Sequence, residues 1–299
     1  MIFVVIFYAG NILVGKAINE LPPFTIAFFR LFLAFLIVLP IAWKKTWINK
    51  NLFIKYKWPF LLMTLSGVTF FNTFIYGSLQ FTTSSNVAVL ETIIPALTVV
   101  LSAILLKERL IKIQWLGVCV SLFGALWVVM DGRIFQIATM DWNPGDGIMI
   151  GAIISWSVYS IMVKKYMHLF PAFAALLVMT GISIIVLLPF VAIEWLIVGV
   201  PSLYQTDLVI GLVYLGVFPS FIALIFFNRA VGVLGASRAS IFLNFLPVFT
   251  ILGAYLWLNE EITSMQITGT VIVIFGVLMT TQAGKKRGNS KWKQDSSTS

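Results

Sequence analysis

Long runs of apolar residues, separated by short polar stretches, cover most of the 299-residue chain. The runs are continuous rather than alternating, and each is close to the roughly 20 residues that a helix needs to cross a bilayer. They are too long for the strands of a membrane barrel. The pattern predicts an all-α integral membrane protein with ten transmembrane helices, at residues 1–18, 23–43, 58–79, 84–106, 112–131, 146–163, 172–195, 207–228, 235–258 and 265–282.

One stretch of the chain occurs twice, because residues 85–124 return at residues 237–276 with a constant offset of 152. Pro95 and Pro247 are one of the identical pairs at this offset. Five spans per copy is an odd number, so the second copy enters the membrane from the opposite side and the two copies are inverted-topology repeats. We expect two five-helix repeats at residues 1–131 and 146–282, followed by a basic tail at residues 283–299.

Basic residues gather on one side of the predicted bundle. When the loops are sorted by the ten crossings, seventeen of the 20 Lys and Arg residues fall on the side that holds both termini. Basic loops mark the cytoplasmic face, so we expect a multi-pass protein of the cytoplasmic membrane with both termini in the cytoplasm. The net charge of +9 is not gathered on a folded domain, so we expect no nucleic-acid partner.

Composition narrows the chemistry that the chain can perform. Hydrophobic residues make up 60% of the chain and charged residues 10%, so lipid must be the solvent for much of its surface. The chain has one histidine, His168, one cysteine, Cys119, and one carboxylate deep in a predicted span, Glu91. These groups assemble neither a metal site nor a catalytic pair, so we expect no cofactor, no metal and no catalytic residue. An integral membrane enzyme is the least favoured alternative.

Short motifs recur in a fixed order through both copies. They are Gly10-Asn11, Lys16, Pro22-Pro23, Arg30, Ser84-Ser85, Pro95, Glu108, Gly117 and Gly124, then Trp156, Lys164, Pro171, Ser237, Pro247, Glu260, Gly269 and Gly276. In these motifs the chain resembles the drug/metabolite transporter (DMT) superfamily, in its ten-helix EamA-type form. The resemblance implies export of small metabolites or drugs across the cytoplasmic membrane without ATP hydrolysis. One departure is that Tyr8 and Ala9 stand where the family usually carries a tryptophan before the glycine.

The repeated prolines lie near the middle of their spans. A proline lacks the amide donor for the carbonyl four residues back, so Pro95 and Pro247 are expected to kink their helices close to the bilayer midplane. Thr92 and Asn244 stand three residues before these prolines. Freed backbone at that depth is tolerated against protein or a water-filled cavity, which favours a substrate pathway over a simple packing kink.

Two charges lie deep in the predicted bundle. Glu91 lies about 10 Å below the end of its span, at 1.5 Å per residue, and Arg30 lies at a similar depth. Such charges mark functional sites unless they are paired. Glu91 would then bind a proton or a cationic group of the substrate. The alternative is a structural ion pair between Glu91 and Arg30, and the sequence leaves both open.

Amide and aromatic residues complete the candidate pathway. Trp156 and Tyr159 share one helix face, as do Asn72 and Tyr76, and Asn228 is the repeat partner of Tyr76. Helix–helix packing is the alternative for each of them. The candidate pathway residues are Asn11, Arg30, Asn72, Tyr76, Glu91, Thr92, Trp156, Tyr159, Asn228 and Asn244.

The sequence therefore favours a secondary transporter that exports small metabolites such as amino acids by alternating access, with protons as a candidate coupling ion. The alternative transporter exports organic cations or drugs, with Glu91 as the counter-charge. The expected partners are a small-molecule substrate and the lipid bilayer.

Overall fold

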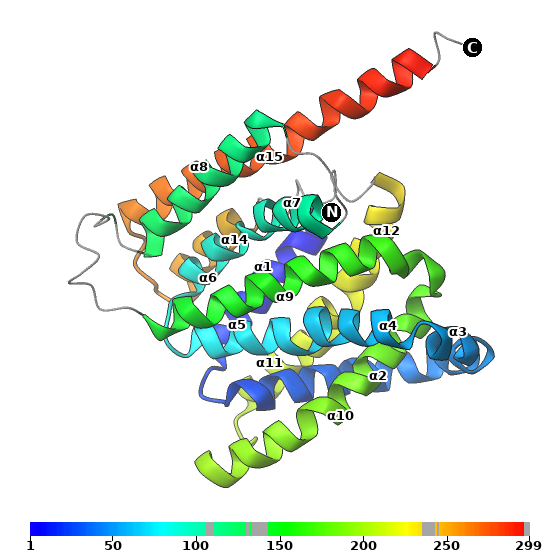
Figure 1. The fold of residues 1–299 in the computed structure, drawn as a ribbon. Helices are drawn as coiled ribbons and strands as arrows, with labels where there is room; N and C mark the ends of the chain where they lie inside the picture. Colours follow the sequence, from blue (N-terminus) through cyan, green and yellow to red (C-terminus); the bar gives the residue numbers. More distant parts are fainter. Residues whose placement is uncertain (106–110, 130–131, 133–142, 235–242, 244, 296–299) are drawn as a thin grey trace.

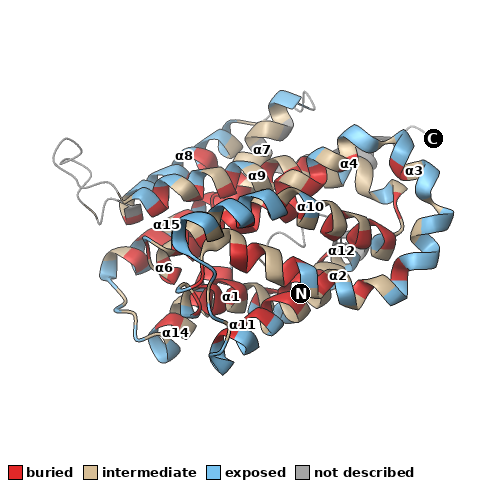
Figure 2. Ribbon diagram, turned by 90° about the horizontal axis from the view of Figure 1, so that it is seen from below, coloured by how far each residue is buried: buried red, intermediate tan, exposed pale blue. Residues whose placement is uncertain are grey.

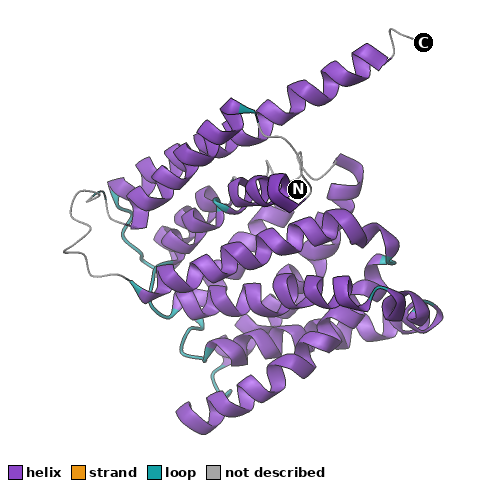
Figure 3. Ribbon diagram, in the orientation of Figure 1, coloured by secondary structure: helices purple, strands orange, loops and turns teal. Residues whose placement is uncertain are grey.

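The computed structural model describes residues 1–105, 111–129, 132, 143–234, 243 and 245–295. Figure 1 shows a bundle of helices that run back and forth between two opposite ends. Across the described ranges the regular structure is helical throughout and contains no strand (Figure 3). The expectation of an all-α protein is confirmed.

The described part of the first half of the chain forms α-helices and one π-helix. They are α1 (Ile2–Ala17), α2 (Pro23–Ile48), α3 (Lys50–Lys55), α4 (Lys57–Met63), the π-helix η1 (Thr64–Phe70), α5 (Phe71–Leu79), α6 (Ser84–Glu91), α7 (Ile94–Leu105) and α8 (Lys112–Val129). The second half follows with α9 (Pro144–Tyr166), the 3-10 turn η3 (Met167–Leu169), α10 (Ala172–Val198), α11 (Thr206–Val217), the π-helix η4 (Phe218–Ala223), α12 (Leu224–Leu234), α14 (Leu246–Trp257) and α15 (Ser264–Asp295).

Six helical stretches are long and apolar enough to cross a membrane, and each coincides with a predicted span. They are Pro23–Ile48, Lys57–Leu79, Ser84–Leu105, Pro144–Leu169, Ala172–Val198 and Thr206–Phe227. Shorter apolar helices lie at the other four predicted positions, namely Ile2–Ala17, Lys112–Val128, Leu246–Trp257 and Ser264–Met279. Most of the first half of the ninth predicted span, residues 235–242 and 244, lies outside the described residues.

Large apolar side chains cover the outside of the bundle as well as its interior. Figure 2 shows the buried residues mainly on the faces that the helices turn toward one another. On the outer face of α10, Leu196 is 86% exposed and Ile185 is 73% exposed. A surface of this kind suits lipid rather than water.

A helix begins directly before each of the repeated prolines. α6 ends at Glu91 and α7 begins at Ile94, so Pro95 lies in the first turn of α7. Between them, the amides of Thr92 and Ile93 bond to carbonyls only three residues back, at 3.1 and 3.0 Å. In the second half, α14 begins at Leu246 with Pro247 in its first turn. The missing proline amide donor explains the interruption between α6 and α7, and it suits the place of both prolines in a first helical turn.

A wide π-helical turn interrupts a long helix in each half. η1 lies between α4 and α5, and η4 lies between α11 and α12. When the repeat offset of 152 is subtracted from the residue numbers of η4, the resulting range overlaps that of η1. In each segment a hydroxyl donates to the carbonyl five residues back, from Thr69 to Thr64 at 3.3 Å and from Ser220 to Leu215 at 2.6 Å. Such turns widen a helix locally and often occur at functional sites.

Glycines bring α8 and α15 into close contact. A Cβ at Gly276 would lie 2.7 Å from the carbonyl oxygen of Gly117 and 2.4 Å from the amide nitrogen of Ser121. A Cβ at Gly269 would lie 3.1 Å from the carbonyl oxygen of Gly124. The repeat offset relates Gly117 to Gly269 and Gly124 to Gly276, so each contact is the repeat image of the other. The two helices therefore cross at glycines that leave room for backbone against backbone.

Two glutamates of the second half cap helices of the first half. Glu194, near the end of α10, accepts hydrogen bonds from the amides of Phe24 and Thr25, at 3.1 and 2.8 Å, and from the Thr25 hydroxyl at 2.7 Å. These amides open α2, where a helix has unpaired donors and a partial positive charge. The indole of Trp195 donates to the same hydroxyl at 2.9 Å.

The second cap joins Glu260 to the start of α6, at the same end of the bundle, on the left of Figure 1. One carboxylate oxygen accepts from the amide and hydroxyl of Ser84, at 2.9 and 2.7 Å. The other accepts from the amide and hydroxyl of Ser85, at 3.3 and 3.0 Å. Asn259 has a φ of 52° and ends α14 in the left-handed conformation that commonly closes helices. We call the contacts of Glu260 with Ser84 and Ser85 the Glu260 clamp.

Candidate functional site

Arg30 lies inside α2, and its side chain is only 3% exposed. Its Nε atom donates to the Ser220 hydroxyl at 2.8 Å. Its Nη1 atom donates to the amide oxygens of Asn11 and Asn72, at 2.8 and 2.7 Å, and to the hydroxyl of Tyr76. The Tyr76 hydroxyl donates in turn to the Asn11 oxygen at 2.8 Å. We call these five residues the Arg30 cluster.

The Arg30 cluster joins four elements through one side chain. Asn11 comes from α1, Asn72 and Tyr76 come from α5, and Ser220 comes from η4. All four partners of Arg30 are buried, with exposed fractions of 8% or less. Four of the predicted pathway residues, Asn11, Arg30, Asn72 and Tyr76, are thus brought together in direct contact.

All acceptors in the Arg30 cluster are neutral, so the guanidinium charge has no carboxylate partner there. A charge buried without a counter-ion costs several kcal/mol, which hydrogen bonds offset only in part. The Nη2 group makes no hydrogen bond to any described residue. Arg30 therefore keeps two N–H donors for another anion or acceptor, and a carboxylate is the group that a guanidinium binds best.

Glu91 is the last residue of α6, directly before the helix break, and its side chain is half-buried. No ion pair joins Glu91 to Arg30, so the structural pair that the sequence left open is not formed in this structure. Both charges nevertheless lie within electrostatic range of the Tyr8 and Tyr76 phenols. Arg30 and Glu91 therefore act on the same two phenols but are not bonded to each other.

Trp156 and Tyr159 of α9 form an aromatic face beside this region. Their ring centroids lie 5.0 Å apart, and the Trp156 ring lies 4.3 Å from that of Phe71. The Tyr159 ring fits against Gly67 of η1, where a Cβ would come within 2.2 Å of it. The buried hydroxyls of Tyr8 and Tyr159 have no hydrogen-bond partner among the residues that the structure describes. Phenols without a partner are available to a polar molecule between the helices.

The remaining sequence candidates divide into two groups. The Thr92 hydroxyl bonds to the carbonyl of Val89 at 2.5 Å, so it serves its own helix. The Asn228 side chain and the whole of Asn244 lie outside the described residues. Lys16, a motif residue, donates to the carbonyls at the end of the third predicted span, Leu79 at 2.8 Å and Thr82 at 2.9 Å. Its ammonium therefore caps a helix end.

Ser220 and Tyr8 belong to the site but were not singled out from the sequence. Ser220 follows Pro219 inside a predicted span. A proline in a span indicates an irregular helix, and this is the sequence feature that points to Ser220. Tyr8 stood at a departure from the family pattern. Among the described residues no three His, Cys, Asp or Glu side chains are placed to hold a metal ion.

One family model matches most of the chain, and the similar proteins are named as transporters. The model of the EamA-like transporter family matches residues 1–130 and 143–282. An uncharacterized transporter from Bacillus subtilis, YyaM, is 26% identical over 242 residues, which cover 79% of this chain and 75% of that protein. An uncharacterized transporter from Archaeoglobus fulgidus is 27% identical and covers 92% and 93%.

One similar protein has a name that includes a substrate. The S-adenosylmethionine uptake transporter of Rickettsia prowazekii is 28% identical over 275 residues, which cover 91% of this chain and 87% of that protein. Among solved structures, one crystal structure has the same fold, with a TM-score of 0.64 over 95% of this chain and 96% of that chain, at 15% identity.

Proposed function

The chain belongs to the EamA-like transporter family, and on that basis we propose that it is a secondary transporter of the cytoplasmic membrane that exports small metabolites such as amino acids by alternating access. The observation that carries this proposal is the Arg30 cluster. A buried guanidinium with two unused N–H donors is held between four helical elements, with Glu91 and two unpartnered phenols nearby. Side chains of this kind suit a small polar solute.

Alternating access requires two similar halves of opposite orientation, and we infer two inverted five-helix repeats at residues 1–131 and 146–282. Three features support this inference. The proline breaks recur in both halves, as do the π-helical turns. The glycine contacts between α8 and α15 are exchanged by the repeat offset. A twofold axis between inverted halves would exchange these two glycine contacts in the same way.

The proposed orientation of the protein in the membrane rests on the distribution of its lysines and arginines. We propose that the lysine-rich end of the bundle, with both termini, faces the cytoplasm. The end with Glu194 and Glu260 would then face outward. Since both glutamates join the second half to helices of the first, we propose that they hold the outer end closed while the inner end admits substrate. Opening outward would require these contacts to break.

The proposed substrate carries both a carboxylate and a positively charged group, as amino acids do. The carboxylate would bind the free Nη2 donors of Arg30, and the cation would approach Glu91. The helix break lies directly after Glu91, and the missing amide donor of Pro95 would leave the Glu91 carbonyl free to accept from a polar solute. A proton on Glu91 would compete with the cationic group of the substrate, which makes protons the proposed coupling ion.

Export of organic cations is the second candidate, because Glu91 has no ion-pair partner among the described residues. The relative from Rickettsia prowazekii is named for S-adenosylmethionine, a molecule that combines an amino acid group with a sulfonium cation. It therefore fits either candidate. That relative is named for uptake, so an assay of this chain must measure both directions.

Metabolite profiling tests the proposal without assuming a substrate. Cells with and without the protein are compared for solutes inside and in the medium, beside cells with Arg30→Lys at equal membrane levels. We expect an amino acid or related zwitterion to accumulate in the medium only with the unaltered protein. Accumulation of lipophilic cations instead would favour the second candidate. Equal profiles in all three strains would contradict transport.

A further inference from the structure

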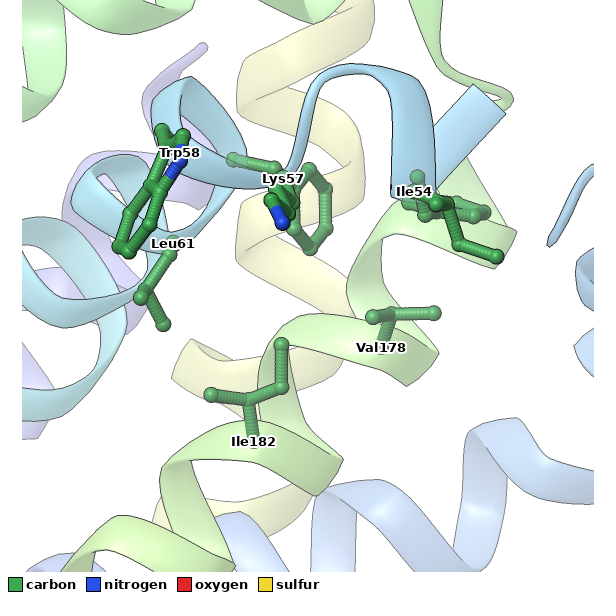
Figure 4. A pocket seen from close by; sticks show the side chains of 8 residues that line it. Ile54, Lys57, Trp58, Leu61, Val178 and Ile182 are labelled. Carbon is green, nitrogen blue, oxygen red and sulfur yellow. The ribbon is translucent and has the colours of Figure 1, made fainter. Parts of the chain in front are cut away.

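A cavity of about 380 Å³ lies apart from the Arg30 cluster, between α10 and the elbow that α3 and α4 form. In Figure 4, Val178 and Ile182 on α10 face Ile54 and Leu61 on the elbow. The lining is apolar with the exception of Lys57, which lies at the elbow beside Trp58. The volume lies in the range of cavities that hold small molecules, but the lining offers almost no hydrogen-bonding group.

The inner part of the cavity is built on packed aromatic rings. Phe53 and Phe60 line it, and their centroids lie 5.0 Å apart. Both rings also pack on Phe170 from the connection between α9 and α10, at 5.2 and 4.9 Å. Phe53 and Phe60 are buried, with exposed fractions of 9% and 2%. The cavity is therefore a preformed hollow with a rigid base.

One lysine at the cavity, Lys57, carries a positive charge without a carboxylate partner among the described residues. Lys57 is exposed and makes no hydrogen bond or ion pair with a described residue, and its ammonium lies 5.6 Å from the centroid of the Trp58 ring. Lys44, Lys45, Lys50 and Lys55 precede it, and the chain has no Asp or Glu between Glu20 and Glu91. Lysines next to tryptophan and tyrosine are typical of the boundary between lipid tails and headgroups.

We propose that this cavity is a binding site for an anionic phospholipid. One acyl chain lies in the apolar hollow between α4 and α10, and the headgroup phosphate lies at the Lys57 ammonium. The apolar lining excludes a polar metabolite, and the uncompensated lysines require a negative headgroup. Anionic lipids are the abundant ligands of that description beside a basic membrane face. The site goes beyond the proposed transport function and does not depend on it.

Native mass spectrometry of the purified full-length protein tests the proposal. The protein in neutral detergent is titrated with dioleoyl phosphatidylglycerol or dioleoyl phosphatidylcholine, and the bound lipids are counted. We expect one phosphatidylglycerol to bind more tightly than phosphatidylcholine. Lys57→Glu should weaken the phosphatidylglycerol complex about fivefold or more, the effect of one lysine at an anionic surface. Ile182→Trp, which fills the hollow, should weaken binding of both lipids.

Lys44→Glu is the matched control, because it makes the same charge change on the same basic segment away from the lining. It should leave the tight phosphatidylglycerol complex in place. Equal weakening by Lys44→Glu and Lys57→Glu would show attraction to diffuse charge and overturn the site. Unchanged binding in Ile182→Trp would also overturn it. Val178→Trp fills the hollow from the neighbouring turn of α10 and replaces Ile182→Trp if that variant does not fold.

Discussion

Arg30 holds its charge inside the bundle because the oxygens of four neutral side chains accept hydrogen bonds from it. If the guanidinium is removed, all four acceptors lose a donor, and the Asn72 oxygen loses its only described partner, so we expect the cluster to loosen as a whole. The same geometry leaves the Nη2 donors unused, which separates Arg30 from an arginine that only ties helices together. Both roles depend on the planar, forked shape of the guanidinium.

Arg30→Lys tests that dependence. A lysine keeps the charge but has a single nitrogen, which cannot reach acceptors on three other elements. We expect the variant to insert into the membrane, to unfold at a temperature several degrees lower, and to transport at least tenfold more slowly. Thermal unfolding and a transport assay measure both effects. Arg229→Lys, at an exposed position of α12, is the control and should change neither.

Glu91→Gln tests the second charge. Glutamine keeps the size of the side chain but neither ionises nor carries a proton, so we expect transport to fall at least tenfold and to lose its dependence on pH. Transport is measured over a pH series in vesicles with equal amounts of inserted protein. Glu20→Gln, at an exposed position, should behave as the unaltered protein. A Glu91→Gln pH profile like that of the unaltered protein would rule out Glu91 as the proton site.

At the scale of the helices, the Glu260 clamp is the most specific contact between the two halves. Glu260→Gln keeps the size of the side chain but removes the charge that faces the helix terminus. This should weaken the clamp by about 1–2 kcal/mol, a shift of roughly 5–30-fold between closed and open ends. We expect faster labelling of a cysteine placed at Ser78, in a Cys119→Ser background. The matched control is Glu261→Gln, which alters an exposed neighbour with no clamp contact. Equal labelling in both variants would show that the clamp closes nothing.

The crossing of α8 and α15 gives a second prediction for the helices. A methyl group at Gly276 would meet backbone atoms of α8, which cannot turn aside, so Gly276→Ala should destabilise the protein by about 1–3 kcal/mol. Gly147→Ala is the control, because a Cβ there meets nothing within 4 Å. Thermal unfolding in detergent should show a lower midpoint only for Gly276→Ala. Equal midpoints would contradict the close contact.

The sequence predicts the helices well because its apolar runs and prolines act locally. α7 and α14 begin beside Pro95 and Pro247, and the grouping of Asn72 with Tyr76 follows from helical spacing. Local patterns do not predict contacts between segments that are far apart in the sequence. The Glu260 clamp joins residues about 175 positions apart in the sequence. The hydrogen bond from Arg30 to Ser220 joins residues 190 positions apart. The π-helical turns also have no periodic signature in an apolar run.

For the whole molecule, we distinguish the features that occur in both halves from the two deep charges, Arg30 and Glu91, that occur in only one. In the alternating access that we propose, the repeated prolines, π-helical turns and glycines would give both halves the same mechanical features. Arg30 and Glu91 have no such counterparts, since Leu243 stands at the repeat position of Glu91. We therefore assign the motion to the repeated features and the choice of substrate to the unrepeated charges.

Counterflow in proteoliposomes tests this account most directly. Purified protein is reconstituted in liposomes loaded with unlabelled leucine, and entry of labelled leucine or labelled tetraphenylphosphonium is followed. We predict exchange of leucine that needs internal leucine, that disappears with Arg30→Lys and that persists with Arg229→Lys. Leucine exchange at the same rate in the Arg30→Lys liposomes, or no exchange of either solute by the unaltered protein, would contradict the account.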